Sequence, residues 1–139
     1  MILKSFELTK IKLNNYKYYL FYGDNEGLKE EGIKNLFEKN YQNKIQRYEE
    51  KEILDNINVF FNSVLTKSFF DNEKLIIINR ATDKIRIIIE ELIEKDPEDI
   101  QIILNSKNLE KKSILRKLFE KEKSIVCIPF YEDNNQTLN

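Results

Sequence analysis

The segment YYLFYGDNEGLKE, residues 18–30, decides how this chain folds. Its first five residues form an unbroken apolar run, which is typical of a β-strand covered on both faces. Gly23 and Asp24 end that run as turn residues do. Apolar residues then recur at roughly helical spacing from Leu28 to about Asn40. A buried strand, a short turn and a helix in this order indicate a protein of the α/β type.

The same alternation continues along the rest of the chain. We expect strands at 44–48, 75–78, 100–104 and 124–129, and helices at 5–13, 53–65, 85–93 and 109–119. The run LIII at 75–78 has no polar alternation, so this strand should lie inside the sheet. Strands that alternate with helices imply parallel crossover connections. The sequence therefore predicts a three-layer α/β sandwich around a mainly parallel five-stranded sheet.

Length and charge limit the domain organisation and the class of protein. The 139 residues suit one domain, which we place at 1–130, and the polar tail 131–139 is interpreted as the start of a linker. Charged residues make up 34% of the chain, yet the net charge is only −1, which argues against a dedicated DNA-binding domain. We find no secretory signal and no apolar run of membrane-spanning length, so we expect a cytoplasmic protein.

Cysteine and histidine usage excludes several chemistries. Cys127 is the only cysteine and histidine is absent, so neither an internal disulfide nor histidine-dependent acid–base catalysis is available. A multi-cysteine zinc site is excluded for the same reason. Cys127 falls in an apolar run, and we expect it to be buried and structural. We therefore predict no metal and no cofactor.

The turn after the first strand resembles a phosphate-binding loop that has lost its chemistry. A P-loop has the pattern G-x-x-x-x-G-K-[ST], in which backbone amides, a lysine and a magnesium-binding hydroxyl converge on phosphates. Here only three residues separate Gly23 from Gly27, Lys29 is displaced by one position, and Glu30 replaces the hydroxyl. Asp24 would add negative charge beside a phosphate. We interpret Gly23, Asp24 and Gly27 as a degenerate phosphate loop that binds no nucleotide.

Two further patterns bear on nucleotides and nucleic acids. Asn79-Arg80 follow the strand at 75–78, where a nucleotide hydrolase carries a magnesium-binding acid and a receiver domain carries its phospho-acceptor aspartate. Asp83 comes several residues too late for either role. Six basic residues cluster between 107 and 121: Lys107, Lys111, Lys112, Arg116, Lys117 and Lys121. This basic set could contact phosphates, but a helix face exposed to solvent also accounts for such a cluster.

Three segments together resemble a known family. The stretch YGDNEGL at 22–28 is similar to the Y-G-x-[DN]-E-G-L of the delta subunit of bacterial DNA polymerase III, especially in alphaproteobacteria. The segment SFF at 68–70, just before a strand, resembles that family's S-L-F segment, and LEKKSILRKL at 109–118 resembles a family helix. The resemblance implies an AAA+/RecA-like (P-loop NTPase-like) fold with a degenerate nucleotide site. It also implies a clamp-loader subunit domain that is no enzyme by itself, although its holoenzyme is a DNA-directed DNA polymerase.

The resemblance also implies a partner and a binding segment. In the family, the S-L-F segment enters a hydrophobic pocket of the β sliding clamp, and other clamp-loader subunits bind through regions beyond this sequence. Contact with DNA would be weak or indirect. By position, the clamp-binding residues are Leu65, Thr66, Lys67, Ser68, Phe69 and Phe70. An exposed pair of aromatic side chains is an efficient anchor in a partner's pocket.

Other interpretations of these residues stay open at the level of sequence. Phe69 and Phe70 could instead cap the end of the helix predicted at 53–65, since aromatic side chains are usually interior. The chain could be a divergent P-loop ATPase or nucleotide kinase, against which the loop at 23–30 argues. It could also be an α/β interaction domain with another partner.

Overall fold

The computed structural model describes residues 16–38, 45–65, 74–122 and 125–130. The helix expected at 5–13 and the tail 131–139 lie outside these residues. Strands and helices alternate along the chain, in the order β1 (Tyr18–Tyr22), α1 (Glu26–Leu36), β2 (Ile45–Glu49), α2 (Glu50–Asp55), α3 (Ile57–Leu65), β3 (Lys74–Asn79), the 3-10 turn η4 (Asp83–Ile85), α4 (Arg86–Lys95), β4 (Ile100–Asn105), α5 (Ile114–Lys121) and β5 (Ile125–Pro129). No helix in the described part of the chain is long and apolar enough to cross a membrane.

The five strands form one sheet in the order β2-β3-β4-β1-β5, and every neighbouring pair is parallel. The predicted parallel sheet is therefore confirmed. Strand β3 lies between β2 and β4, and residues 75–78 are at most 1% exposed. The interior position that the LIII run predicted is confirmed as well.

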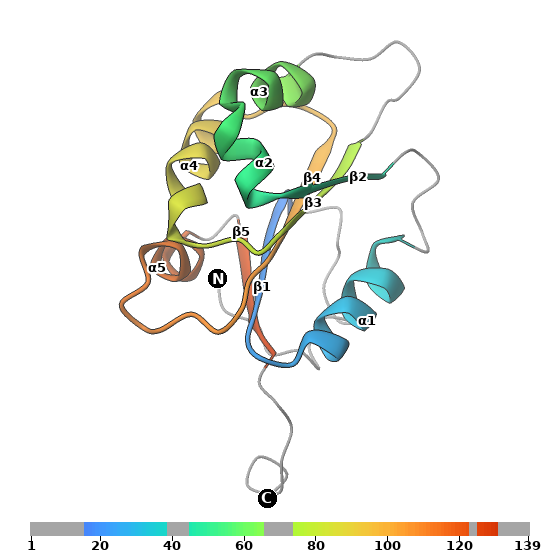
Figure 1. The fold of residues 1–139 in the computed structure, drawn as a ribbon, viewed down its shortest axis with the longest axis vertical. Helices are drawn as coiled ribbons and strands as arrows, with labels where there is room; N and C mark the ends of the chain where they lie inside the picture. The colour runs from blue at the N-terminus through green and yellow to red at the C-terminus, as the bar shows by residue number, and fades with distance from the viewer. Residues whose placement is uncertain (1–15, 39–44, 66–73, 123–124, 131–139) are drawn as a thin grey trace, which may run out of the picture.

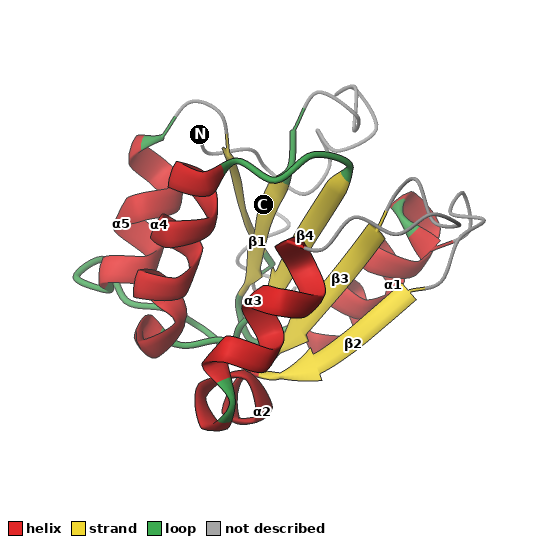
Figure 2. Ribbon diagram, turned by 90° about the horizontal axis from the view of Figure 1, so that it is seen from above, coloured by secondary structure: helices red, strands yellow, loops and turns green. Residues whose placement is uncertain are grey.

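Helices cover both faces of the sheet, and each face has its own core (Figures 1 and 2). Alternation along β1 shows the division, because Leu20 faces the core under α2 to α5 whereas Phe21 faces the core under α1. Both side chains are fully buried. Strands covered on two sides need no polar alternation, which explains the continuous apolar runs in the sequence. The three-layer prediction is confirmed.

The single helix predicted at 53–65 is wrong, because the chain forms two helices that are separated at Asn56. Helix α2 begins earlier, at Glu50, where Glu49 and Glu52 make a capping box. Asn56 leaves the helical conformation with φ −143° and ψ 63°, and its N–H bonds the Ile53 carbonyl. Helix α3 then starts anew and buries Phe60 and Val64 against the sheet. Periodicity alone could not show the break, since apolar residues continue on both sides of Asn56.

The helix predicted at 109–119 begins five residues later, at Ile114. Ser113 is its N-cap, and its hydroxyl accepts a hydrogen bond from the Arg116 amide at 3.2 Å. The Leu109 carbonyl oxygen, which would bond a backbone amide if the helix began at 109, accepts a hydrogen bond from the Arg116 guanidinium at 2.8 Å. This bond holds the loop before α5 against the helix. Where they fall within the described residues, the other predicted boundaries differ from the structure by a few residues at most.

Candidate functional site

The turn after β1 is packed tightly between the ends of β4 and β5. Gly23 has φ +128°, and a Cβ atom at this position would lie 2.0 Å from the Phe130 carbonyl oxygen. Its amide donates to the Lys107 carbonyl at 3.3 Å, and the Asn25 amide donates to the Phe130 carbonyl at 3.1 Å. Glycine is therefore required here by its conformation and by the neighbouring backbone.

At the N-terminus of α1, which follows this turn, several backbone amides bond the protein's own oxygen atoms. The Asn25 side chain accepts the Leu28 amide at 3.1 Å, and the Glu26 amide donates to the Asp24 carbonyl at 3.1 Å. In a phosphate loop such amides point at the ligand. Here the amides of residues 23, 25, 26 and 28 already bond oxygen atoms of the chain. That Gly23, Asp24 and Gly27 form a degenerate phosphate loop which binds no nucleotide stays a prediction.

Lys29 lies inside the protein rather than in the space above the turn. Its side chain is fully buried, and its ammonium group lies 2.6 Å from Glu26 Oε1 and 2.6 Å from the Ser106 carbonyl oxygen. A phosphate-loop lysine instead extends toward the ligand. The sequence shows that Lys29 is displaced by one position, but it does not show that the ammonium group links α1 to the end of β4.

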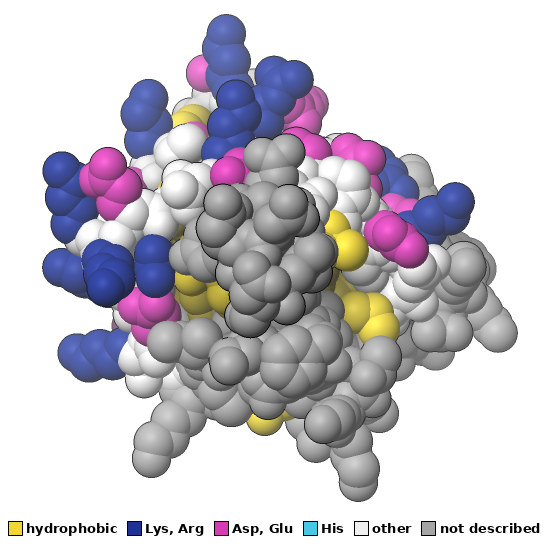
Figure 3. All heavy atoms as spheres, turned by 90° about the horizontal axis from the view of Figure 1, so that it is seen from below, with side chains coloured by type: hydrophobic (Ala, Val, Ile, Leu, Met, Phe, Trp, Pro, Cys, Tyr) yellow, Lys and Arg dark blue, Asp and Glu magenta, His cyan; other side chains and the backbone are white. Residues whose placement is uncertain are grey.

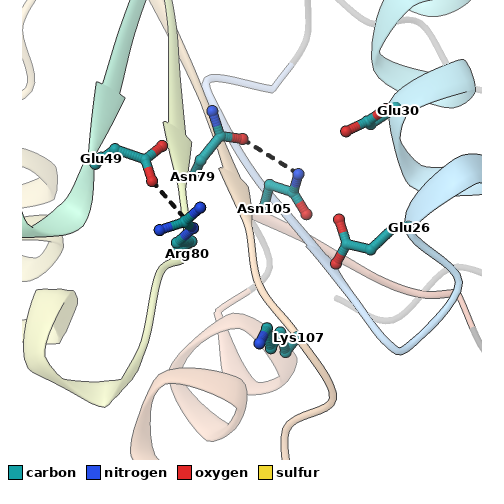
Figure 4. A pocket seen from close by; sticks show the side chains of 7 residues that line it. All are labelled: Glu26, Glu30, Glu49, Asn79, Arg80, Asn105 and Lys107. Carbon is teal, nitrogen blue, oxygen red and sulfur yellow. Dashed lines mark hydrogen bonds and ion pairs between the residues drawn. The ribbon is translucent and has the colours of Figure 1, made fainter.

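A pocket of about 520 Å³ opens beyond the carboxyl ends of the strands, and its seven side chains are drawn in Figure 4. Across it, Asn105 Nδ2 donates to Asn79 Oδ1 at 3.2 Å, and Arg80 pairs with Glu49 at 3.2 Å. The end of β3 thus presents a carboxamide where a magnesium-dependent hydrolase has a carboxylate. The seven lining residues are Glu26, Glu30, Glu49, Asn79, Arg80, Asn105 and Lys107.

Asp83, the next acid after β3, supports the start of α5 instead of facing this pocket. Its Oδ1 accepts the Ser113 hydroxyl at 2.5 Å and the Leu115 amide at 3.1 Å. Partial burial disfavours its charge, but these hydrogen bonds and the nearby Arg86 hold the pKa of Asp83 below its usual range. No three potential metal ligands among His, Cys, Asp and Glu come together in the part of the chain that the structure describes.

The predicted basic set is confirmed as exposed except for one member. Lys107, Lys111, Lys112, Lys117 and Lys121 are exposed, and lysine and arginine side chains gather on the left of Figure 3, where α5 lies. Arg116 does not belong to this surface, because its guanidinium lies 5.0 Å from the centre of the Tyr22 ring and bonds Glu120 at 3.0 Å. Arg116 is a structural residue that holds the loop before α5.

Cys127 is buried in β5, as the sequence predicted. Burial, and to a lesser degree the charge of Glu120, raise the pKa of its thiol to about 12. The thiolate, which is the reactive form, is therefore scarce at neutral pH. Cys127 has the properties of a packing residue.

Comparison with known proteins assigns the chain to a family. The sequence pattern of the family described as "DNA polymerase III, delta subunit" matches residues 19–128. The chain belongs to this delta subunit family. A DNA clamp loader delta protein of Bacillus subtilis has a similar structure, with a TM-score of 0.66 and 16% sequence identity over 94% of this chain. The match covers 42% of the B. subtilis chain, so this chain spans less than half of that protein's length. No curated protein matches the sequence.

The predicted clamp-binding residues of this delta-family chain fall mostly outside the described residues. Leu65, the last residue of α3, is described and is 39% exposed, whereas Thr66 to Phe70 lie within the range 66–73 that is not described. On either side of this range, the described residues are linked by a hydrogen bond from Lys74 Nζ to the Ser63 carbonyl at 2.6 Å. Lys74, the first described residue after this range, begins β3, whereas the pocket lies at the carboxyl end of that strand.

Proposed function

We propose that this chain is a non-hydrolysing, N-terminal domain of a clamp-loader delta subunit that binds the β sliding clamp through residues 65–70. The observation that carries the proposal is the family match over residues 19–128, combined with the SFF segment at 68–70 in the position of the family's S-L-F segment. Binding would favour an open clamp that other subunits, which hydrolyse ATP, load onto primed DNA.

The surroundings of residues 66–73 support this role. The described residues before and after it are held by the domain, because α3 packs Phe60 and Val64 into the core and Lys74 bonds the carbonyl of Ser63. A short segment held at both ends loses less conformational freedom on binding than a free peptide does. Phe69 and Phe70 would then be presented to the clamp from a rigid base.

The closed turn after β1 supports the non-hydrolysing part of the proposal. Gly23, Asn25 and Leu28 commit their amides within the protein, and Lys29 commits its ammonium group. A nucleotide would have to break these contacts before its phosphates could bind. Because these groups are already bonded within the protein, the turn is not preorganised to bind ATP. This favours a non-hydrolysing clamp-binding domain over the alternative of a divergent ATPase or nucleotide kinase.

Strand β3 separates the two regions. Its six residues, at about 3.3 Å each, place residue 74 roughly 17 Å from the pocket edge at Asn79. Substitutions in residues 65–70 should therefore leave the pocket intact, and substitutions in the pocket should leave clamp binding unchanged.

A pull-down with the cognate sliding clamp tests the proposal. The immobilised chain should retain the clamp, and a synthetic peptide of residues 63–72 should compete for it, whereas the same peptide with Phe69→Ala and Phe70→Ala should not. Failure of the chain to retain the clamp at micromolar concentrations would contradict the proposal. Retention that the peptide does not reduce would move the binding surface elsewhere on the domain.

A further inference from the structure

The pocket lies at the switch point of the sheet. Strands β1 and β4 are neighbours, but β1 continues into α1 on one face whereas β4 leads to α5 on the other (Figure 2). Connections that diverge in this way leave a crevice beyond the strand ends, where α/β proteins bind their ligands. Glu26 and Glu30 of α1 and Asn105 of β4 line this crevice. The position favours a ligand even though the phosphate-binding groups are committed elsewhere.

The side of the pocket formed by α1 and Asn105 offers hydrogen-bond acceptors. Asn105 is only 7% exposed, and its Oδ1 is buried without a hydrogen-bond partner among the described residues. Figure 4 shows this oxygen directed toward the Glu26 carboxylate, so that two acceptors face each other across the pocket. A buried acceptor without a donor is costly, so Asn105 Oδ1 calls for a donor in the pocket. The Glu26 carboxylate, which is half exposed and already accepts from Lys29, can accept a further hydrogen bond from the same donor group.

The charged residues on the α1 side of the pocket, next to Asn105, favour a cation there. Glu26 is balanced by the buried Lys29, and Glu49 pairs with Arg80 on the opposite wall. The Glu30 carboxylate, by contrast, makes no ion pair and no hydrogen bond with any described residue. Lys107 lies at the far end of the pocket from Glu30 in Figure 4. The Glu30 carboxylate, which forms no ion pair with a described residue, therefore stands on the same side of the pocket as Asn105 Oδ1 and Glu26.

We propose that the space between α1 and Asn105 binds a guanidinium group. A guanidinium carries five N–H donors in a planar fork, so it can serve Asn105 Oδ1 and the carboxylates of Glu26 and Glu30 at once. A compact ammonium group places its three donors around one nitrogen and serves separated acceptors less well. The group could belong to a free alkylguanidine or to an arginine side chain of another polypeptide. This inference does not depend on the proposed binding of the clamp.

Titration of the ¹⁵N-labelled 139-residue chain with methylguanidinium tests the proposal. Saturable amide shifts are expected around Glu30 and Asn105. Glu30→Gln should weaken binding roughly fivefold, whereas the matched variant Glu31→Gln, an exposed neighbour on α1 that does not line the pocket, should bind normally. Three results would overturn the proposal: equal shifts with tetramethylammonium, which has no N–H donor; unchanged binding in Glu30→Gln; or saturation of the same amides by inorganic phosphate.

A second arm distinguishes the two sources of the group. The blocked tripeptide Ala-Arg-Ala is compared with methylguanidinium and with the same peptide containing citrulline, which keeps the shape but loses the charge. Tighter binding of the arginine peptide than of methylguanidinium assigns the site to a polypeptide, and equal binding assigns it to the isolated group. If the citrulline peptide binds as well as the arginine peptide, a guanidinium site is excluded.

Discussion

Replacing Lys29 by Ala separates a buried structural lysine from a phosphate-binding one. The lysine side chain is fully buried, so its removal leaves a cavity, and truncating a buried side chain of this size costs about 2–5 kcal/mol. The Ser106 carbonyl, bonded at 2.6 Å in the wild type, also loses its donor. Glu26 is half exposed and returns to water, so the lost ion pair adds little. Because an ammonium group no longer has to be buried, we expect a net loss of about 3 kcal/mol.

That loss is easily measured for a chain of this length. The unfolding entropy of 139 residues is about 0.3 kcal/mol per kelvin, so the melting temperature should fall by roughly 10 °C. Lys29→Met, which restores the bulk but not the hydrogen bonds, should recover part of the difference. The control Lys34→Ala, at an exposed position of α1, should stay within about 0.5 kcal/mol of the wild type in urea denaturation.

Calorimetric titration with ATP and magnesium completes this experiment. The wild type should give no saturable heat, because the loop amides and the lysine are already bonded within the protein. Micromolar ATP binding that is lost in Lys29→Ala, with stability unchanged, would refute the reasoning. The lysine would then be a ligand for phosphate.

Three other variants or probes test the remaining structural assignments. Gly23→Ala should destabilise the fold by several kcal/mol in urea denaturation, because the new Cβ atom would lie 2.0 Å from the Phe130 carbonyl oxygen. Gly27→Ala should instead stabilise it by about 0.5–1 kcal/mol, because Gly27 lies in α1 and the nearest atom to its new Cβ is 4.0 Å away. The pKa of Asp83 is lower in the folded than in the unfolded state, so its contribution to stability is present above about pH 4 and is lost as the pH falls through the folded pKa. Between pH 7 and pH 3, Asp83→Asn should therefore lose less stability than the wild type does. Cys127, with a pKa raised to about 12, should resist a thiol reagent at pH 8 in the native protein and react at once in denaturant, and rapid native reaction would show that β5 is accessible.

The sheet could be predicted from the sequence because its signal is local and strong. Fully buried parallel strands require continuous apolar runs, and residues 18–22, 75–78 and 102–104 supply them. The interior position of β3 and the burial of Cys127 follow from the same patterns. The family resemblance, read from three short segments, is confirmed by the match over residues 19–128.

The contacts that shape the candidate site could not be predicted, because they join residues far apart in the sequence. Lys29 bonds a carbonyl 77 residues away, and Asp83 supports the start of α5 across 30 residues. The sequence gives no periodic signal for such bonds. A signal did exist for Asn105, since a polar residue directly after the apolar run at 102–104 lies at the ligand-binding edge of a parallel sheet. The lack of a donor for its Oδ1 becomes apparent only in three dimensions.

We propose that residues 65–70 bind the sliding clamp. The most direct test compares the dissociation constants of two complexes, the clamp with the wild-type chain and the clamp with the double variant Phe69→Ala/Phe70→Ala. Burying two aromatic anchors contributes about 2 kcal/mol or more each, so the variant should bind roughly 100-fold or more weakly. Its melting temperature should barely change if the pair is exposed. A folded double variant that binds the clamp with wild-type affinity would contradict the account. A variant that unfolds would instead place both side chains in the core, where truncation costs about 3–5 kcal/mol each.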